Sequence, residues 1–360
     1  MFTFEADDEL ALIVDMARRL AKDELQPKTR QAEKSRSPDE RLRLVWQEVG
    51  LASLELPVAH DGPGLGCLAR VLVNEELAAG DAGAALALDP FGPAATTALE
   101  VGGEDAVGAL IRAVGYLGDR ALFVSAHDAQ ISICDDVLDL RAGWVPAEKA
   151  KAVVVLSGDE AFLVTEGLQF DPVRGAGLRA AGAASLTLKA APIAARWSNS
   201  SGAGRALARA RLYYASLLLG ILRASCEFAT DYAQQREAFG KPIGHHQALA
   251  FLITDMHMAL DAARLVVQEA AWRVDQGLPC EVEASSAWAE CIEISRTIGP
   301  NGVQVLGGHG FMADYPVEKH MREARALGLM LGGYDAAVDF AGARLTESEM
   351  PLALCMPGAL

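Results

Sequence analysis

The sequence predicts an α+β fold that is mainly helical, with N-terminal helices, a small central sheet and a C-terminal helical bundle. Three observations lead to this order. Apolar residues recur at helical spacing through the first third of the chain, beginning at Leu10, Ile13, Val14, Ala17 and Leu20. Short β-rich runs separated by Gly, Asp and Pro follow between about residues 114 and 193. Long helical periods then return from Arg205 onward, so helices and strands are segregated rather than alternating as βαβ units.

Length and charge limit the classes of protein that fit. With 360 residues, the chain is too long for one compact core, and two or three packed units are expected. Hydrophobic residues make up 51% and charged residues 22%, which predicts a folded globular protein. The formal net charge of -16 disfavours nucleic acid and anionic membrane surfaces as partners.

The N-terminal domain is predicted to span residues 1–115. An amphipathic helix is expected from Asp8 to Leu25. A second is expected within "PDERLRLVWQEVGLASLELP", closed by Gly50, and a longer one in "GCLARVLVNEELAAGDAGAALAL" after a glycine-rich turn.

The central domain is predicted at residues 116–197 and the C-terminal bundle at 198–360. Strands are expected in "ALFVSA", "AQISIC", "AKAVVVLSG", "EAFLVTE" and "SLTLKAAPI". The Ser, Gly and Asn content of "AARWSNSSGAG" predicts a connector between the two domains. One stripe of a long bundle helix runs through Leu249, Leu252, Met256, Leu260, Ala263, Val267, Ala270 and Val274.

Several kinds of site are not indicated. The six cysteines are far apart, and neither they nor the histidines fall into a metal-ligand spacing, so reduced thiols and no metal are expected. No strand is followed by G-x-G-x-x-G or a P-loop, and no serine stands in G-x-S-x-G. The N-terminus mixes acids into its apolar positions, unlike a signal peptide, which predicts a cytoplasmic protein without a membrane span.

Three positions are ligand candidates on chemical grounds. Arg236, in "QQREAFGKPIGHHQ", stands where two helices join, and a guanidinium there can bind a phosphate by paired hydrogen bonds. Pairing of Arg236 with Glu237 or another acid is the alternative. The glycines of "GPNGVQVLGGHGFMADYP" permit close approach of a ligand, with Gln304 nearby, although a helix C-cap would look the same. Arg264, beside the apolar stripe, either points into the bundle or extends to solvent.

Three linked segments resemble the C-terminal bundle of the acyl-CoA dehydrogenase family. They are "REAFGKPIGHHQ", "MALDAARLVVQEAAWRVDQG" and "QVLGGHGFMADYPVEKHMREAR", in that order and at those intervals. The segments "VWQEVGLASLELPVAHDGPGLG" and "NEELAAGDAG" resemble the helical N-terminal domain of the same family. The resemblance therefore covers both ends of the chain and implies the three-part fold of that family.

The resemblance also implies an activity and its partners. In such enzymes FAD lies at subunit interfaces of dimers or tetramers. A glutamate removes the α-proton of an acyl-CoA thioester, hydride leaves to flavin N5, and the electrons pass to an electron-transfer flavoprotein. By position, the FAD-contacting residues would be Arg236, Phe239, Gln247, Gln304, Gly307 and Gly308. Arg264 would match a pocket arginine near the acyl chain.

The sequence departs from the family at the base and at the flavin-contacting loop. The usual glutamate position is Leu331, and the alternative position used by some relatives is Ala210. Neither side chain can abstract a proton. Asp335 and Asp314 are the nearest carboxylates in sequence, and neither is assigned as the base. "SAHDAQISIC" stands where a T-E-x-x-A-G-S-D-like segment is expected, and the β domain looks shortened.

These departures predict the base-less subunit of a heteromeric acyl-CoA dehydrogenase, as in the α2β2 enzymes of bacterial steroid side-chain breakdown. The chain retains the motifs that reach a neighbour's FAD and lacks those that serve its own. The alternatives are a self-sufficient dehydrogenase with a relocated carboxylate, a flavin oxidase or monooxygenase on the same fold, and a non-catalytic scaffold.

Overall fold

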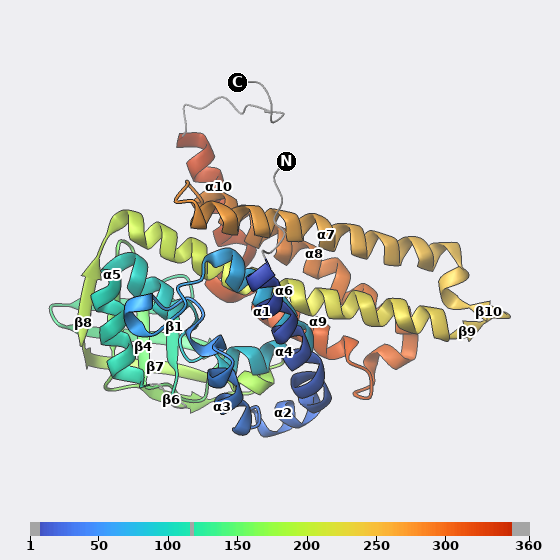
Figure 1. Cartoon of the computed structure of the whole chain (residues 1–360), viewed down its shortest axis with the longest axis horizontal. Coiled ribbons are helices and arrows are strands. Elements are labelled where there is room, and N and C mark those ends of the chain that lie inside the picture. Colours follow the sequence, from blue (N-terminus) through green and yellow to red (C-terminus); the bar gives the residue numbers. More distant parts are fainter. Residues whose placement is uncertain (1–7, 116–118, 348–360) are drawn as a thin grey trace.

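The computed structural model describes residues 8–115 and 119–347, and these form three structural parts (Figure 1). Helices make up the first part, in the order α1 (Asp8–Leu20), α2 (Thr29–Ser35), α3 (Arg41–Glu48), α4 (Cys67–Leu88) and α5 (Gly92–Val114). The expected helix from Asp8 is interrupted, because Ala21–Leu25 form a wider π-helical turn. Gly50 adopts a left-handed conformation (φ 77°) just after α3, as a helix-terminating glycine should.

The central part is a pair of four-stranded sheets. Their strands are β1 (Ala121–Ser125), β2 (Gln130–Cys134), β3 (Val137–Val145), β4 (Ala152–Ser157), β5 (Glu160–Val164), β6 (Gln169–Pro172), β7 (Ala184–Pro192) and β8 (Ala195–Ser198). One sheet has the order β1-β4-β5-β8 and the other β2-β3-β7-β6. Strands β1 and β4 pair in parallel and the other neighbours are antiparallel.

Strands β1 and β4 are apolar on both faces because both faces are covered. Leu122 and Val124 pack into the core between the two sheets, whereas Phe123 points into the core shared with the helices. Helix α5 covers that second face. Such double coverage explains why these runs read as continuous apolar stretches rather than alternating ones.

The C-terminal part is the expected helical bundle. It contains α6 (Ser200–Gln235), α7 (Gln247–Asp275), α8 (Glu281–Leu306), α9 (Val317–Leu327) and α10 (Gly333–Glu347). The predicted stripe on α7 is confirmed, with Met256, Leu260 and Val267 buried. A short hairpin of β9 (Glu237–Ala238) and β10 (Lys241–Pro242) joins α6 to α7. By length and composition α6 could cross a membrane, but most of it is buried within the molecule.

The expected connector at residues 194–204 is wrong. Residues 195–198 form strand β8, which pairs with β5, and α6 begins at Ser200. The Asn199 side chain caps α6 by accepting a hydrogen bond from the Gly202 N–H at 3.1 Å. Residues typical of a loop therefore serve here as a helix N-cap.

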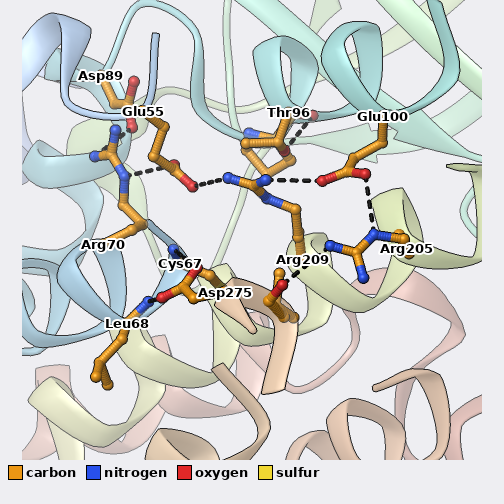
Figure 2. Close-up of polar contacts among 12 residues, drawn as sticks. Glu55, Cys67, Leu68, Arg70, Asp89, Thr96, Glu100, Arg205, Arg209 and Asp275 are labelled. Carbon is orange, nitrogen blue, oxygen red and sulfur yellow. Dashed lines mark hydrogen bonds and ion pairs between the residues drawn. The ribbon is translucent and has the colours of Figure 1, made fainter. Parts of the chain in front are cut away.

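A buried polar network joins the N-terminal helices to α6 (Figure 2). The Glu55 carboxylate lies between Arg70 and Arg209, at 2.8 Å from each. Arg209 also pairs with Glu100 at 2.8 Å, and Arg70 with Asp89 at 3.3 Å. Each of these charges has an opposite partner, which is the condition for burying it.

We expect Arg209→Met to lower the free energy of unfolding by about 3–5 kcal/mol, because it removes one of the two arginine partners from both Glu55 and Glu100. Urea denaturation would measure the loss. The matched control is Arg196→Met, which breaks the exposed pair between Arg196 and Glu160 and should cost less than about 1 kcal/mol. Equal losses in the two variants would contradict a stabilising role for the network.

Candidate functional site

A cavity of about 880 Å³ lies between the sheets and the C-terminal helices. Its walls come from the ends of β1 and β3, residues 174–177, and helices α8 and α9. The lining is largely apolar and includes Phe123, Trp144, Pro146, Pro300, Met321 and Met330. A concave apolar site of this size suits a flat aromatic ring or an acyl chain.

Arginines also line this first cavity. Arg322 pairs with Glu33 at 3.0 Å and with Glu318 at 2.7 Å, so its charge is already compensated. Arg174 and Arg325 are exposed and make no ion pair among the described residues. The cavity therefore combines an apolar body with cationic groups that can receive an anionic ligand group.

The position expected for the base is occupied by a core residue. Leu331 is fully buried in the turn η8 (Met330–Gly332), and it has a left-handed backbone with φ 56°. Gly332 and Gly333 follow with φ 75° and 69°. Ala210, the alternative position, is fully buried on α6. Neither position offers a titratable group.

The carboxylate that meets this turn is Asp128, which the sequence did not single out. Asp128 follows β1, is half-buried and lines the first cavity. Its Oδ1 accepts a hydrogen bond from the Gly332 N–H at 3.3 Å. Burial raises the pKa of Asp128 to about 6, although backbone donors including Gly332 and Leu331 oppose the shift. Asp128 belongs to the segment "SAHDAQISIC", but no spacing rule in the sequence connects it to the turn at Gly332, about two hundred residues later.

His127 lies where the first cavity meets a second one of about 840 Å³. The second cavity is more polar and is bounded by the N-termini of α6 and α8 and by α10. Burial and the nearby Arg211 lower the pKa of His127, so the imidazole is neutral at physiological pH. The turn between β1 and β2 therefore presents an acid and a neutral imidazole side by side at the junction of two cavities.

Arg211 is a buried cation without a carboxylate partner among the described residues. It lies on α6, donates a hydrogen bond from Nη1 to the Ser285 hydroxyl, and stands 4.8 Å from the Phe340 ring centroid. Its Nε and Nη2 have no hydrogen-bond partner within the described part of the chain. Burial lowers the pKa of Arg211 to about 10, which leaves it charged at neutral pH.

The residues expected to contact FAD lie at the opposite end of the bundle from the sheets (Figure 1). We call this end the tip, comprising Arg236, Phe239, Gln247, Gln304, Gly307 and Gly308. All six are exposed or partly exposed, and Phe239, with φ 55°, is 97% exposed. A hydrogen bond of 2.7 Å between Tyr232 and His309 holds the end of α6 against the glycine turn η7 (Gly307–Phe311), so the two predicted motifs are neighbours.

The tip has the chemistry to receive a phosphate-bearing ligand. Arg236 makes no ion pair among the described residues, so the expected alternative of pairing with Glu237 is not seen. Among the described residues, and apart from the immediate chain neighbours, no heavy atom lies within 4 Å of the place where a Cβ would stand on Gly307 or Gly308. Open glycine backbone beside a free guanidinium suits a ligand that approaches the main chain closely.

Arg264 points into the bundle, which is one of the two orientations expected from the sequence. Its guanidinium pairs with Glu75 of α4 at 2.9 Å and also with Asp261. It lines neither of the two cavities. Asp335 and Asp314 are exposed and line neither cavity as well. The contacts of Arg264 thus favour a role in holding α7 against α4.

Comparison with known proteins assigns both ends of the chain. Residues 7–107 match the family description "Acyl-CoA dehydrogenase, N-terminal domain" and residues 201–346 match "Acyl-CoA dehydrogenase, C-terminal domain". An acyl-CoA dehydrogenase of Bacillus subtilis is 41% identical over 115 residues, which is 32% of this chain and 30% of that protein. The curated relatives are thus matched over about a third of their length or less.

Solved structures match the fold over nearly the whole chain. Butyryl-CoA dehydrogenase from Megasphaera elsdenii superposes with a TM-score of 0.83 at 22% identity, covering 96% of this chain and 100% of that one. A chain of the ChsE4-ChsE5 complex from Mycobacterium tuberculosis gives 0.82 at 22% identity, covering 97% and 100%. The expected three-part fold is confirmed, and this chain belongs to the acyl-CoA dehydrogenase family.

Proposed function

We propose that this chain takes part in FAD-dependent α,β-dehydrogenation of an acyl-CoA thioester as the base-less subunit of a heteromeric complex. The observation that carries the proposal is an exposed tip in a chain that has no base at either family position. All six tip residues are exposed at the hairpin end of the bundle, whereas Leu331 and Ala210 are fully buried and cannot take a proton. A ligand bound to the tip is therefore accessible to a neighbouring subunit.

In this proposal the tip completes the FAD site of a partner subunit. FAD, when bound, supplies the acceptor for the hydride that leaves the β-carbon. Arg236 would bind a phosphate oxygen, Gln304 would donate or accept a hydrogen bond, and Gly307 and Gly308 would let the ligand approach the backbone. The partner subunit would supply the carboxylate that takes the α-proton, because Leu331 and Ala210 cannot do so.

Two further features support a heteromer. Removing an α-proton from a thioester requires a carboxylate placed against the reacting carbon, and the described part of this chain has none at either family position. The ChsE4-ChsE5 complex from Mycobacterium tuberculosis, which shares this fold, is named for two components. The electrons would pass to an electron-transfer flavoprotein.

The flavin content of the purified protein tests this proposal. We expect the chain expressed alone to hold little FAD, and near-stoichiometric FAD to appear after co-expression with an acyl-CoA dehydrogenase chain encoded beside it. Absorbance of the flavin per chain and the mass in solution are the measurements. A fully flavinated homo-oligomer that oxidises acyl-CoA at ordinary enzyme rates would overturn the base-less assignment.

Arg236→Ala should weaken FAD binding by the complex about 10- to 100-fold, because a charge-assisted hydrogen bond contributes about 1.5–3 kcal/mol. FAD titration followed by fluorescence would measure the change. Arg19→Ala, which removes an exposed arginine on α1, is the control and should leave FAD affinity unchanged. The same affinity in both variants would show that the tip does not hold the cofactor.

A self-sufficient enzyme with a relocated carboxylate is the second candidate, and Asp128 is the observation that favours it. This carboxylate lines the first cavity and contacts the turn where the family base would stand. Its raised pKa, about 6, would suit a general base working near neutral pH.

Asp128→Asn separates the two candidates. If Asp128 is the base, the variant should lose at least about 100-fold in kcat, and the wild-type kcat/KM should fall as the pH drops through about 6, because only the ionised carboxylate accepts a proton. In the heteromer, the variant should retain full activity. Asp335→Asn, an exposed carboxylate outside both cavities, serves as the control for a general effect of charge removal.

A further inference from the structure

A third cavity, of about 430 Å³, lies where the N-terminal helices meet the central sheets. Its walls come from the residues after α2, from α3, the end of α4, the residues before β1, the β3–β4 loop and the turn Arg179–Ala181. Cations outnumber acids in its lining. The cations are Arg36, Arg43, Arg120, Lys149 and Lys151, and the acids are Asp119 and Glu148. The third cavity is therefore positively charged, in a chain whose formal net charge is -16.

Two arginines of the third cavity are held by carbonyl oxygens rather than by carboxylates. Arg43 donates a hydrogen bond from Nη1 to the Ala87 carbonyl at 3.1 Å. Arg120 donates one from Nη1 to the Pro146 carbonyl at 2.8 Å. Neither guanidinium makes an ion pair within residues 8–115 and 119–347. Since a guanidinium carries five N–H donors, most of the donors on both side chains are left for a ligand.

The positive charge of Arg120 is poorly compensated within the chain. Burial lowers the pKa of Arg120, and the charge of Arg43 lowers it further, although Asp89 is among the groups that oppose the shift. Asp89 is already paired with Arg70 at 3.3 Å. Two like charges fixed near each other cost free energy, which an anion bound between them would offset. The geometry of the two arginines therefore favours a bound anion.

The other three cations of the third cavity differ in how far they are already compensated. Arg36 pairs with Glu148 at 3.0 Å, and Lys151 pairs with Asp119 at 3.4 Å. Lys149 is exposed and makes no ion pair among the residues that the structure describes. Two fixed guanidinium groups and one exposed lysine are therefore available to a ligand.

The lining of the third cavity recognises charge rather than an aromatic ring. Its apolar members are all small: Ala87, Ala147, Ala150, Ala180 and Ala181. None of its lining residues is aromatic, so a nucleobase or a flavin would find no ring to stack on. Planar guanidinium groups bind phosphate oxygens by paired hydrogen bonds. The volume is many times the roughly 30 Å³ of one water molecule, which leaves room for more than one phosphate.

We propose that the third cavity binds a small polyphosphate anion, of which inorganic pyrophosphate is the smallest, between Arg43 and Arg120. This site is separate from the tip and does not depend on the proposed heteromer. The β3–β4 loop connects it to the first cavity, because Pro146 lines the first cavity and residues 147–151 line the third. A bound anion would thus tie this wall of the first cavity to the N-terminal helices.

Isothermal titration calorimetry of the full chain with sodium pyrophosphate, at constant ionic strength, tests the site. We expect one anion per chain with a Kd below about 1 mM, at least about 10-fold tighter than for orthophosphate because more oxygens are bound. Arg120→Gln should weaken binding about 10-fold or more. Arg120→Lys keeps the charge but not the paired geometry, and should give an intermediate Kd. The matched control is Arg141→Gln, which removes an exposed arginine of β3 outside the third cavity and should leave the Kd unchanged.

Three results would overturn the proposal. Wild type that binds no pyrophosphate would show that the third cavity is not an anion site. Citrate bound as tightly as pyrophosphate would reduce the site to general attraction of anions. Equal weakening by Arg120→Gln and Arg141→Gln would place the bound anion elsewhere on the chain.

A second variant covers the case in which Arg120→Gln fails to fold, as judged by circular dichroism. Lys149→Gln changes an exposed side chain and should weaken pyrophosphate binding about threefold, because it removes one exposed charge beside the anion. An unchanged Kd in Lys149→Gln would then reject the site. None of these variants alters the tip, so flavin content continues to test the proposed function independently.

Discussion

Burial of the arginines on α6 is the constraint on which the rest of the structure depends. The helix is covered by α4, α5, α7, α8 and α9, so each of its buried charged side chains needs a partner inside the molecule. Arg209 takes Glu55 and Glu100, and Arg223 takes Glu76 at 2.7 Å. Because those acids belong to the N-terminal part of the chain, their ion pairs with the α6 arginines hold that part against the bundle.

Arg211 is the exception among these arginines, because its buried charge has no carboxylate partner within the described residues. Its guanidinium has only a hydroxyl and an aromatic ring as neighbours, and two of its nitrogens lack partners among the described residues. A buried cation of this kind is costly unless something anionic or strongly polar joins it. The positive charge of Arg211 also helps to lower the pKa of His127, which lies at the junction of the two cavities. The polarity of that junction is therefore set by α6 as well as by the β1–β2 turn.

Helix α6 also sets the distance between the two ends of the molecule. Its 36 residues give a length of about 54 Å at 1.5 Å per residue. Asn199 at its start borders the second cavity, and Arg236 at its end belongs to the tip. A ligand bound at Arg236 therefore cannot also occupy the second cavity of the same chain. This separation agrees with the proposed role of the tip toward another subunit.

Much of the fold could be predicted because long amphipathic helices repeat their signal many times. The α7 stripe is an example, with each turn adding the same information. The connector expected at residues 194–204 is wrong because Asn and Ser favour both loops and helix N-caps. Only the residues that follow decide which of the two structures forms. The contact between Asp128 and Gly332 could not be foreseen, since it depends on how the sheet docks on the bundle. The tip residues were grouped by family resemblance, not by any spacing rule.

The turn at Leu331 shows how a site and a core can compete for one position. A left-handed backbone at a non-glycine residue costs about 1 kcal/mol or more, and a fold with no use for the turn would favour glycine there. The Leu331 side chain is fully buried, and burying it contributes about 1.5–3 kcal/mol, which offsets that strain. A glutamate at the same place would face desolvation instead, unless it were protonated or paired. The Asp128 carboxylate holds the adjoining Gly332 N–H, so the turn keeps its shape without a base. The turn thus combines a left-handed backbone with a core side chain, and this combination agrees with the proposed role as a base-less subunit.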